Sequence, residues 1–379
     1  MNVFVDGIIF ARQRHGGVST VWREYLRRLP NYGVTVQLLL PRQHGSAALS
    51  ALLEDRQRYH VIRDYFCWPR RIFERAAVRS AVVRRHLDAS ARVFQSTYFS
   101  TVYGTSIPKV VMLYDMILER QEREPEQRWA EWGIAIKRAA LHNADHIVAI
   151  SQSTRRDLLE TYPAISAGKV TVIPLAAEAP ERHTRVSFPD VIRKCGLDLA
   201  AGSYLLYVGA RHGYKNYQII VDLLRHRRGS RELRVLCVGG ESHQRDLAAL
   251  RALGLERNVL FVEFVGDDEL SVLYRNALAL IYPSRYEGFG LPVLEAMAEG
   301  CPVVCSEAAS LPEVGGDAAL YFAPESVESL ESALTRLLST ARDEIVQRGL
   351  RNAARFSWDR STRALVDLYR GLTGARPAS

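Results

Sequence analysis

Long apolar runs are missing from this sequence of 379 residues. No stretch of about 18 consecutive apolar residues occurs, so no membrane-spanning helix is predicted. Residues 1–6 lack a basic segment and a long apolar core, which argues against a secretion signal. A hydrophobic fraction of 47% and a charged fraction of 24% are typical of a soluble globular chain. We therefore expect a cytoplasmic protein, either free or attached peripherally to the inner face of a membrane.

Cysteines are few, and their spacing is not that of a metal site. Cys301 and Cys305 stand on either side of Pro-Val-Val, with no second pair that would complete a zinc site. We expect all the cysteines to be reduced and mostly packed in the core. They are Cys67, Cys195, Cys237, Cys301 and Cys305. An Asp-x-Asp sequence is absent too, so no bound metal is predicted.

A Gly-x-Gly-x-x-Gly turn after a strand is also absent, which argues against a dinucleotide-dependent oxidoreductase. The charge is unbalanced, because 50 Lys and Arg residues against 42 Asp and Glu residues give a net charge of +8. This surplus favours an anionic partner, such as a nucleotide sugar, an anionic lipid surface or a nucleic acid. No helix-turn-helix, zinc finger or aromatic RNA-binding motif occurs, so we expect no nucleic-acid partner.

The chain is long enough for two domains, and short apolar runs alternate with stretches of helical periodicity. This alternation is typical of doubly wound parallel sheets. In the first half the predicted strands are residues 3–5, 34–40, 110–113, 145–151 and 170–174. Residues 176–202 lose the pattern, so we place the connection between the domains there, with 186–202 as the linker.

Two adjacent glycines, Gly16 and Gly17, lie between the first predicted strand and a helix whose apolar positions begin at Val18. Backbone amides at the start of a helix can hold a diphosphate. A flexible loop would carry the same two residues, so their position alone leaves both interpretations open.

Two cations occupy the equivalent place in the second half of the chain. Arg211 and Lys215 lie between a predicted strand at 204–208 and the next predicted helix, for which Asn216 is a candidate N-cap. Open parallel sheets bind ligands at the carboxyl ends of their strands, where an arginine fork and a lysine ammonium suit a diphosphate. The alternative is a pair of solvated loop cations.

The strongest pattern in the chain is a strand, a glycine turn and a helix at 283–297. Pro292 suits the first turn of a helix, and the glycines before it let a ligand approach free backbone amides. Glu287 and Glu295 flank this turn with seven residues between them. Carboxylates placed in this way can accept hydrogen bonds from the hydroxyls of a sugar or ribose.

Glu287, the Gly-Phe-Gly-Leu-Pro after it and Glu295 resemble the E-x7-E motif of family 4 retaining glycosyltransferases. The resemblance covers nearly the whole chain and is strongest at 204–317. It implies the GT-B fold: two Rossmann-like, doubly wound α/β domains that face each other across a cleft, with a C-terminal helix that crosses back to the first. The implied parts are an acceptor-side domain at 1–185, the linker at 186–202, a donor-binding domain at 203–356 and the returning helix at 357–379.

The resemblance also implies a role for each candidate residue. Arg211 and Lys215 would stabilise charge on the departing nucleoside diphosphate and Glu287 would hold the donor sugar, which makes these three the expected catalytic residues. Glu295 would bind the ribose, and backbone groups would supply most other donor contacts. The expected donor-binding residues are Gly16, Gly17, Val265, Gly288, Phe289, Gly290, Leu291 and Glu295.

Tyr114 and Asp115 follow the strand at 110–113 and are the candidates on the acceptor side. Many members of the family have His-Asp at this place. An unperturbed tyrosine, with a pKa of about 10, donates a hydrogen bond but is a poor base. The replacement therefore leaves the role of Tyr114 open.

Residues 63–92 are rich in arginine and contain the aromatic residues Tyr65, Phe66 and Trp68. This composition fits a solvated helix face. It also fits a surface that contacts anionic lipid headgroups or an anionic acceptor. The sequence leaves both interpretations open.

The implied function is retaining transfer of a sugar from a nucleoside-diphosphate sugar to a hydroxyl of a saccharide or lipid-linked saccharide, in bacterial-type surface polysaccharide assembly. The nucleotide sugar is a co-substrate, and no cofactor is expected. Two alternatives stay open. One is a nucleotide-sugar 2-epimerase on the same fold, and the other is a non-catalytic nucleotide-sugar-binding partner.

Overall fold

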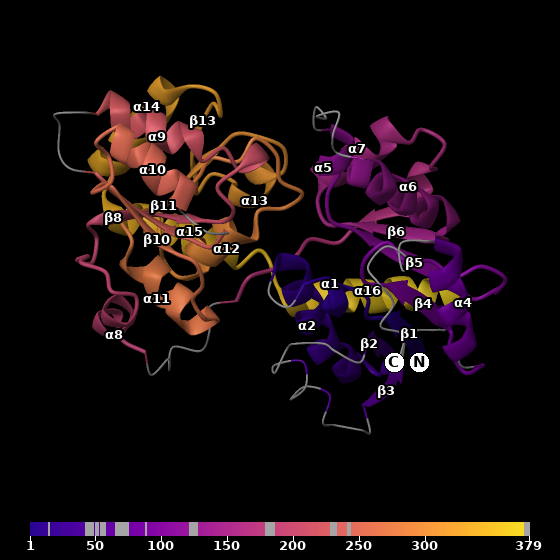
Figure 1. The fold of residues 1–379 in the computed structure, drawn as a ribbon. Helices are drawn as coiled ribbons and strands as arrows, with labels where there is room; N and C mark the ends of the chain where they lie inside the picture. Colours follow the sequence, from indigo (N-terminus) through magenta and orange to yellow (C-terminus); the bar gives the residue numbers. More distant parts are fainter. Residues whose placement is uncertain are drawn as a thin grey trace. The chain divides into compact units, whose positions relative to one another are not determined.

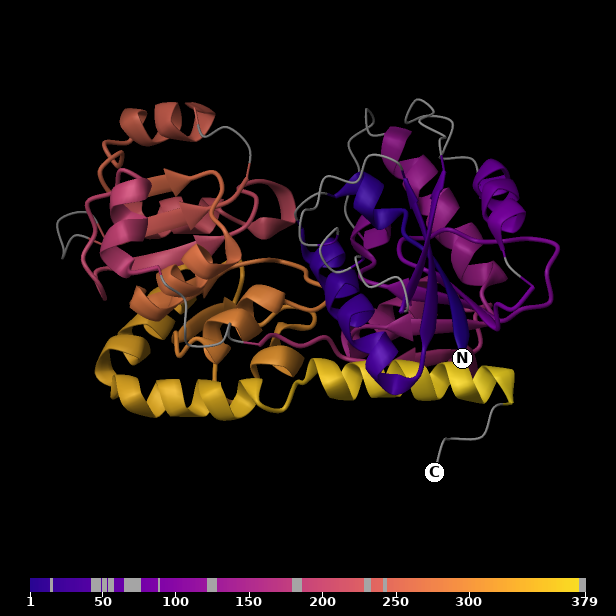
Figure 2. The same ribbon diagram turned by 90° about the horizontal axis from the view of Figure 1, so that it is seen from below.

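The protein is described by a computed structural model (Figures 1 and 2). It describes residues 1–13, 16–41, 49, 53, 58–64, 76–87, 89–120, 128–178, 186–227, 233–240 and 244–374. Residues 65–75 of the aromatic and arginine-rich stretch at 63–92, which include Tyr65, Phe66 and Trp68, lie outside these ranges. In the described part, no helix is both long enough and apolar enough to cross a membrane.

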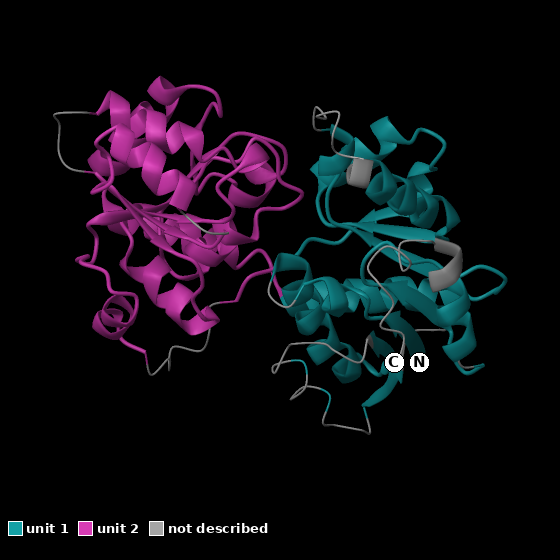
Figure 3. Cartoon of the chain, viewed as in Figure 1, with its two compact units in different colours: residues 1–175, 358–379 teal, residues 176–357 magenta. Residues whose placement is uncertain are grey.

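The chain forms two compact units (Figure 3). The first unit combines Met1–Leu175 with Trp358–Ser379, and the second is Ala176–Ser357. The first break therefore falls before the predicted linker at 186–202, and the second falls within one residue of the predicted start of the returning helix.

A seven-stranded parallel sheet forms the centre of the first unit, in the order β3-β2-β1-β4-β5-β6-β7. Val3 of β1 pairs with Val36 on one side and Val93 on the other, so the order reverses between β1 and β4. The strands are β1 (Asn2–Asp6), β2 (Thr35–Pro41), β3 (Tyr59–Asp64), β4 (Val93–Ser96), β5 (Lys109–Leu113), β6 (His146–Ala149) and β7 (Val170–Val172).

The first unit's longest described helices present one apolar face, as their periodicity predicts. In α2 (Gly17–Arg28) this face includes Val21, Trp22, Tyr25 and Leu26, all essentially inaccessible to solvent. The other helices are α1 (Ile9–Arg12), α4 (Ala76–His86), α5 (Ile117–Arg120), α6 (Arg128–Asn143), α7 (Gln152–Thr161) and α16 (Trp358–Thr373), with short 3₁₀ turns η1 (Leu29–Tyr32) and η2 (Ala167–Lys169).

The C-terminal helix α16 packs within the first unit, as predicted for the returning helix, and contacts α2 (Figures 1 and 2). The Trp358 ring meets Tyr25 edge-on at 5.5 Å between centroids. Near the other end of the helix, the buried Tyr369 hydroxyl donates to Gln95 Oε1 at 2.7 Å. Apolar packing and a buried hydrogen bond therefore fix this helix to the first unit.

The second unit is built on a six-stranded parallel sheet in the order β10-β9-β8-β11-β12-β13, which reverses between β8 and β11. The strands are β8 (Tyr204–Val208), β9 (Arg234–Val238), β10 (Val259–Val262), β11 (Ala279–Tyr282), β12 (Val303–Ser306) and β13 (Leu320–Phe322). The helical segments are α8 (Phe188–Lys194), η3 (Gly213–Lys215), α9 (Gln218–His226), α10 (Gln244–Ala252), α11 (Asp267–Asn276), α12 (Leu291–Ala298), α13 (Leu311–Gly315), α14 (Val327–Ser339) and α15 (Arg342–Ala353).

Helix α8 lies inside the segment that the sequence predicted to lack regular structure. Ser187 caps it by accepting a hydrogen bond from the amide of Asp190, and Val191 and Ile192 are buried. The helix packs against α11 of the second unit. The prediction missed it because seven residues are too few to show helical periodicity.

Each sheet therefore has one point at which the strand order reverses. In open parallel sheets, ligands bind outside the carboxyl ends of the strands at this point. The loops after β1 and β4 lie there in the first unit, and those after β8 and β11 lie there in the second. The fold thus places one candidate binding edge in each unit.

Replacing Tyr369 with phenylalanine should lower the free energy of unfolding of the first unit by about 1–3 kcal/mol, because buried Gln95 Oε1 loses its hydrogen-bond donor. Urea titration followed by circular dichroism measures this. Tyr103→Phe is the matched control, since Tyr103 is 41% exposed. Equal midpoints for the two variants would contradict the assigned role of the Tyr369 hydroxyl.

Candidate functional site

The two loops at the reversal point of the second sheet meet through an ion pair. Lys215 lies in η3 after β8, and Glu287 lies in the turn after β11. Lys215 Nζ is 2.7 Å from Glu287 Oε1 and 3.1 Å from the hydroxyl oxygen of Tyr282. The Tyr282 hydroxyl in turn donates to the same Glu287 Oε1 at 2.9 Å. Three side chains, from η3, from the end of β11 and from the turn after it, thus form a closed triangle.

This triangle is largely shielded from water, since the side chains of Lys215 and Glu287 are 16% and 11% exposed. Burial by itself lowers the pKa of Lys215, but Tyr282 and Glu287 beside it more than offset this and hold the pKa well above its usual value. Burial, and then the charge of Glu287, raise the pKa of Tyr282 well above its usual value. Lys215 is therefore cationic and Tyr282 neutral at physiological pH.

The triangle leaves one hydrogen-bond donor of Lys215 and one acceptor of Glu287 that a ligand could use. A lysine ammonium has three N–H donors, and two of those of Lys215 are used by Glu287 and Tyr282. Glu287 uses only Oε1 in this network, so Oε2 can accept another hydrogen bond. One ammonium proton for an anion and one carboxylate oxygen for a hydroxyl are thereby available side by side.

Arg211, on the same loop, is held by groups of α10, of β10 and of the turn after β9. Its Nε donates to Asp246 Oδ2 at 2.7 Å, and its guanidinium carbon lies 4.9 Å from the centre of the Phe261 ring. Nη1 donates to the Gly239 carbonyl at 2.5 Å. A side chain at Gly240 would lie 2.8 Å from Nη1, so the glycine there makes room for the arginine. Arg211 and Lys215 are therefore both fixed cations on the loop after β8.

The glycine turn after Glu287 is pinned by Ser310. Its buried hydroxyl lies 2.8 Å from the carbonyl oxygens of both Glu287 and Phe289. Gly290, at φ 102°, immediately precedes α12, and a side chain there would lie 2.6 Å from Leu311. Gly288, Phe289, Gly290 and Leu291 accordingly form the turn and the start of the helix, as predicted. Ser310 was missed because it is 23 residues from Glu287 in the sequence.

Asn216 corrects one expectation from the sequence. It does not cap α9, because it adopts a left-handed conformation at φ 55° and no side chain caps that helix. Its buried Nδ2 instead donates to the carbonyls of Pro283 and Pro324, at 3.1 and 2.7 Å. Asn216 therefore ties the loop of Lys215 to the strand end that carries Glu287.

Glu295 lies one turn inside α12, half-buried, where its Oε2 accepts a hydrogen bond from the Tyr274 hydroxyl at 3.1 Å. Burial, and to a smaller extent the charges of Asp267 and Glu299, raise the pKa of Glu295 to about 7. Val265 is buried immediately before α11. Both residues belong to the second unit: Glu295 lies in α12, which follows the glycine turn, and Val265 precedes α11, which packs against α12.

The remaining predicted residues lie in the first unit. Gly16 precedes α2 and Gly17 begins it, so this pair stands at a helix N-terminus, as predicted. Asp115 lies at the carboxyl end of β5, and its Oδ1 accepts from the amide of Ile117 at 3.1 Å. The structure joins Lys215 to Glu287 in the second unit, with Arg211 on the same loop as Lys215. In the first unit it places Gly16 and Gly17 at the N-terminus of α2 and Asp115 just after β5.

Tyr114 is buried and its hydroxyl is fully engaged. It accepts a hydrogen bond from Trp22 Nε1 at 2.5 Å and donates to the Thr97 carbonyl at 3.0 Å. Burial raises the pKa of Tyr114 well above its usual value. This tyrosine therefore braces α2 against the sheet and is not available as a base.

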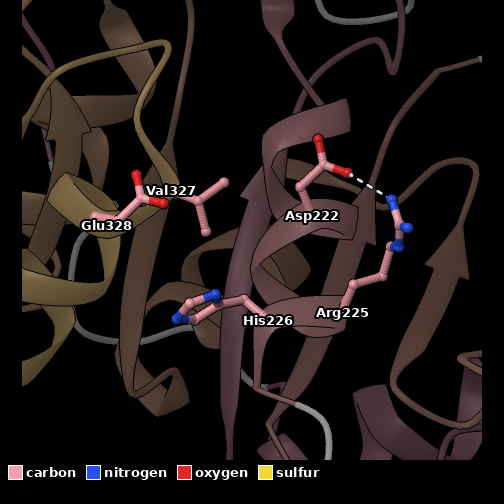
Figure 4. Close-up of a pocket in the computed structure, with 5 residues that line it drawn as sticks. All are labelled: Asp222, Arg225, His226, Val327 and Glu328. Carbon is pink, nitrogen blue, oxygen red and sulfur yellow. Dashed lines mark ion pairs between the residues drawn. The ribbon is translucent and has the colours of Figure 1, made fainter.

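A separate hollow lies on the second unit between α9 and the start of α14 (Figure 4). Asp222, Arg225, His226, Val327 and Glu328 line it, and an ion pair of 3.5 Å joins Arg225 to Asp222. It contains none of the predicted residues. Across the described ranges, no three His, Cys, Asp or Glu side chains gather in a way that could hold a metal ion.

Comparison with known proteins gives consistent results for both units. Residues 200–370 match the family described as Glycosyl transferases group 1, and residues 15–178 match the one described as Glycosyltransferase Family 4. The chain is 32% identical over 241 residues to O-antigen chain mannosyltransferase B of Escherichia coli. That match covers 61% of this chain and 62% of the relative.

Two solved structures show the same fold. Sucrose-phosphate synthase from Thermosynechococcus elongatus superposes with a TM-score of 0.77 at 19% identity, covering 99% of this chain and 100% of the other. Anabaena Alr3699/HepE in complex with UDP-glucose gives 0.69 at 18% identity, covering 98% and 100%. Two parallel-sheet α/β units with a C-terminal helix on the first are thus arranged in chain order as in GT-B proteins.

The raised pKa of Glu295 predicts a pH effect on stability. Between pH 4.5 and about 7, folded Glu295 holds a proton that the unfolded chain releases, so the free energy of unfolding falls as pH rises. Glu295→Gln removes this titration. We expect the variant to become more stable than wild type, by about 1–3 kcal/mol, as pH rises from 4.5 to 8.

Urea titrations at several pH values measure this difference, with exposed Glu256→Gln as the matched control. A difference between Glu295→Gln and wild type that does not change with pH would rule out the shifted carboxyl.

Proposed function

Because the chain belongs to the family 4 glycosyltransferases of the GT-B fold, we propose that it transfers a sugar from a nucleoside-diphosphate sugar to a hydroxyl of a saccharide or lipid-linked saccharide, with retention at the anomeric carbon. The observation that carries the proposal is the Lys215–Glu287–Tyr282 triangle at the reversal point of the second sheet. The process served is surface polysaccharide assembly, supported by the similarity to an O-antigen mannosyltransferase, and mannose is the first donor sugar to test.

In this proposal, the two cations after β8 receive the diphosphate. Lys215 offers its remaining N–H to a phosphate oxygen, and Arg211 adds a second positive charge from a guanidinium already fixed by Asp246. Negative charge grows on the diphosphate as the bond to the sugar breaks. Cations held in place beforehand stabilise that charge without reorganising, which lowers the barrier.

In this proposal, Glu287 and Glu295 bind the uncharged parts of the donor, which are the sugar and the ribose. Glu287 Oε2 accepts a hydrogen bond from a sugar hydroxyl, while the amides at Gly288 to Leu291 face the same ligand from the start of α12. Glu295 accepts from the ribose. Because the Tyr114 hydroxyl is hydrogen-bonded to Trp22 and Thr97, the proposal assigns no side chain as the base. A leaving phosphate oxygen takes the acceptor proton, which is consistent with retention.

A panel of UDP, GDP, ADP and dTDP, with NAD as the control, should identify the donor base. One diphosphate, at about 100 times its dissociation constant, should stabilise the protein by roughly 2.7 kcal/mol, because it binds only the folded state. Thermal-shift measurement reads this directly. If none of the four raises the melting temperature above the NAD control, the assignment of Arg211, Lys215 and Glu287 to a donor site is wrong.

Lys215→Ala and Glu287→Ala should each reduce sugar transfer at least about tenfold, since each removes an interaction with the departing diphosphate or the sugar. Transfer is measured as release of nucleoside diphosphate, with product analysis to separate transfer from epimerisation of the donor. Lys194→Ala is the matched control, because Lys194 forms an exposed ion pair with Glu269 in the same unit. Unchanged turnover in folded Lys215 and Glu287 variants would refute the proposed site.

A further inference from the structure

A stacked cation stands at the reversal point of the first sheet. Arg12 follows β1 and Tyr98 follows β4, the two strands between which the order reverses. The guanidinium carbon of Arg12 lies 5.3 Å from the centre of the Tyr98 ring. Tyr114 stacks on Tyr98 at 6.4 Å between centroids and 22° between planes. The half-buried Tyr98 ring thus carries a cation and a second aromatic ring.

Arg12 itself is exposed and lacks an ion-pair partner among the residues that the structure describes. A guanidinium that lies over the face of an aromatic ring keeps its N–H groups directed outward in the guanidinium's own plane, above the ring. Those N–H groups match the geometry of a phosphate or carboxylate, to which they can form two parallel hydrogen bonds. Stacking therefore orients this cation for an anion.

The carboxylate of Asp115 lies at the same edge of the first sheet, just after β5. Asp115 uses Oδ1 to accept from the Ile117 amide, and no described residue is hydrogen-bonded to Oδ2. Behind it lies Lys137, whose side chain is 2% exposed, with Nζ 3.1 Å from the Asp115 carbonyl and 2.7 Å from Glu119 Oε2. Burying such an ion pair costs desolvation energy, so its place behind Asp115 is consistent with a positioning role.

Local strain marks the same place. Phe99 adopts φ 48°, a left-handed conformation that is unfavourable for a bulky residue. Its ring meets Tyr114 edge-on at 6.5 Å, and Lys137 Nζ lies 5.3 Å from its centre. The Phe99 ring therefore faces inward toward Lys137, whereas the ring of Tyr98, the residue before it, lies beside Arg12.

From this arrangement we infer that Arg12, Tyr98 and Asp115 form an acceptor subsite for a molecule that carries an anionic group close to the hydroxyl that receives the sugar. Arg12 binds the anion, a phosphate or a carboxylate. Asp115 Oδ2 accepts a hydrogen bond from the hydroxyl, and the Tyr98 ring fixes Arg12. The inference rests on the proposed glycosyl transfer and adds the chemical class of the acceptor.

Ligand-observed NMR on the full chain tests the inference with three probes, in the presence of the nucleoside diphosphate that binds in the thermal-shift panel. Methyl α-mannoside is neutral, mannose 6-phosphate carries a phosphate and methyl glucuronide carries a carboxylate. We expect at least one anionic probe to bind wild type about tenfold more tightly than the neutral one, as expected for one charge-assisted contact.

Arg12→Ala should abolish this preference without changing the affinity for methyl α-mannoside or for the diphosphate. Arg138→Ala, which removes another exposed positive charge from the first unit, should retain it. Preference for mannose 6-phosphate alone indicates a phosphate-bearing acceptor, as in a lipid-linked saccharide, whereas preference for methyl glucuronide alone indicates an acidic saccharide.

Three results would overturn the subsite: no preference for either anionic probe in wild type, no binding of any probe, or an undiminished preference in Arg12→Ala. Failure of the proposed function gives a different result, because then no diphosphate stabilises the wild-type protein in the thermal-shift panel. The two failures are therefore read from separate measurements on separate units.

Discussion

The ion pair between Lys215 and Glu287 is the interaction on which the candidate donor site depends. A lysine and a glutamate this shielded from water are stable only when each satisfies the other, and Tyr282 adds a hydrogen bond to both. The pair joins the two loops at which the strand order of the second sheet reverses. It keeps a cation charged and a carboxylate oriented before any ligand arrives, which is the condition for electrostatic stabilisation without reorganisation.

Backbone strain in the described part of the chain gathers at the same edges. The non-glycine residues with positive φ there are Phe99, Asn216 and Ala309. Asn216 follows Lys215, and Ala309 precedes Ser310, whose hydroxyl holds the turn of Glu287. Each left-handed residue therefore lies at the carboxyl end of a strand and next to a side chain that shapes a candidate site. Buried hydrogen bonds and packing against the sheets hold these unfavourable loop conformations in place.

Tyr114 shows how a departure from a family pattern can be resolved by contacts. A tyrosine in place of histidine left its role open, since either residue can donate a hydrogen bond. The structure encloses its hydroxyl between Trp22 and Thr97, so the side chain links α2 to the strand ends instead of facing an acceptor. Its ring, however, supports Tyr98 and through it Arg12. Tyr114 therefore has a structural role in the first unit and not a role in proton transfer.

The sequence by itself determined the alternation of strands and helices, the two-unit organisation and the glycine turn between Glu287 and Glu295, whereas the returning helix was implied by the resemblance to GT-B glycosyltransferases. These features depend on periodicity, glycine and proline chemistry and spacing along the chain, all of which are local. Helix α8 was missed because it is short, and the role of Asn216 was misjudged because its partners are Pro283 and Pro324. Only the tertiary structure decided that Lys215 pairs with Glu287, that Ser310 pins the turn and that Arg12 stacks on Tyr98. Those contacts join residues far apart in the sequence, and the order of strands in each sheet brings them together.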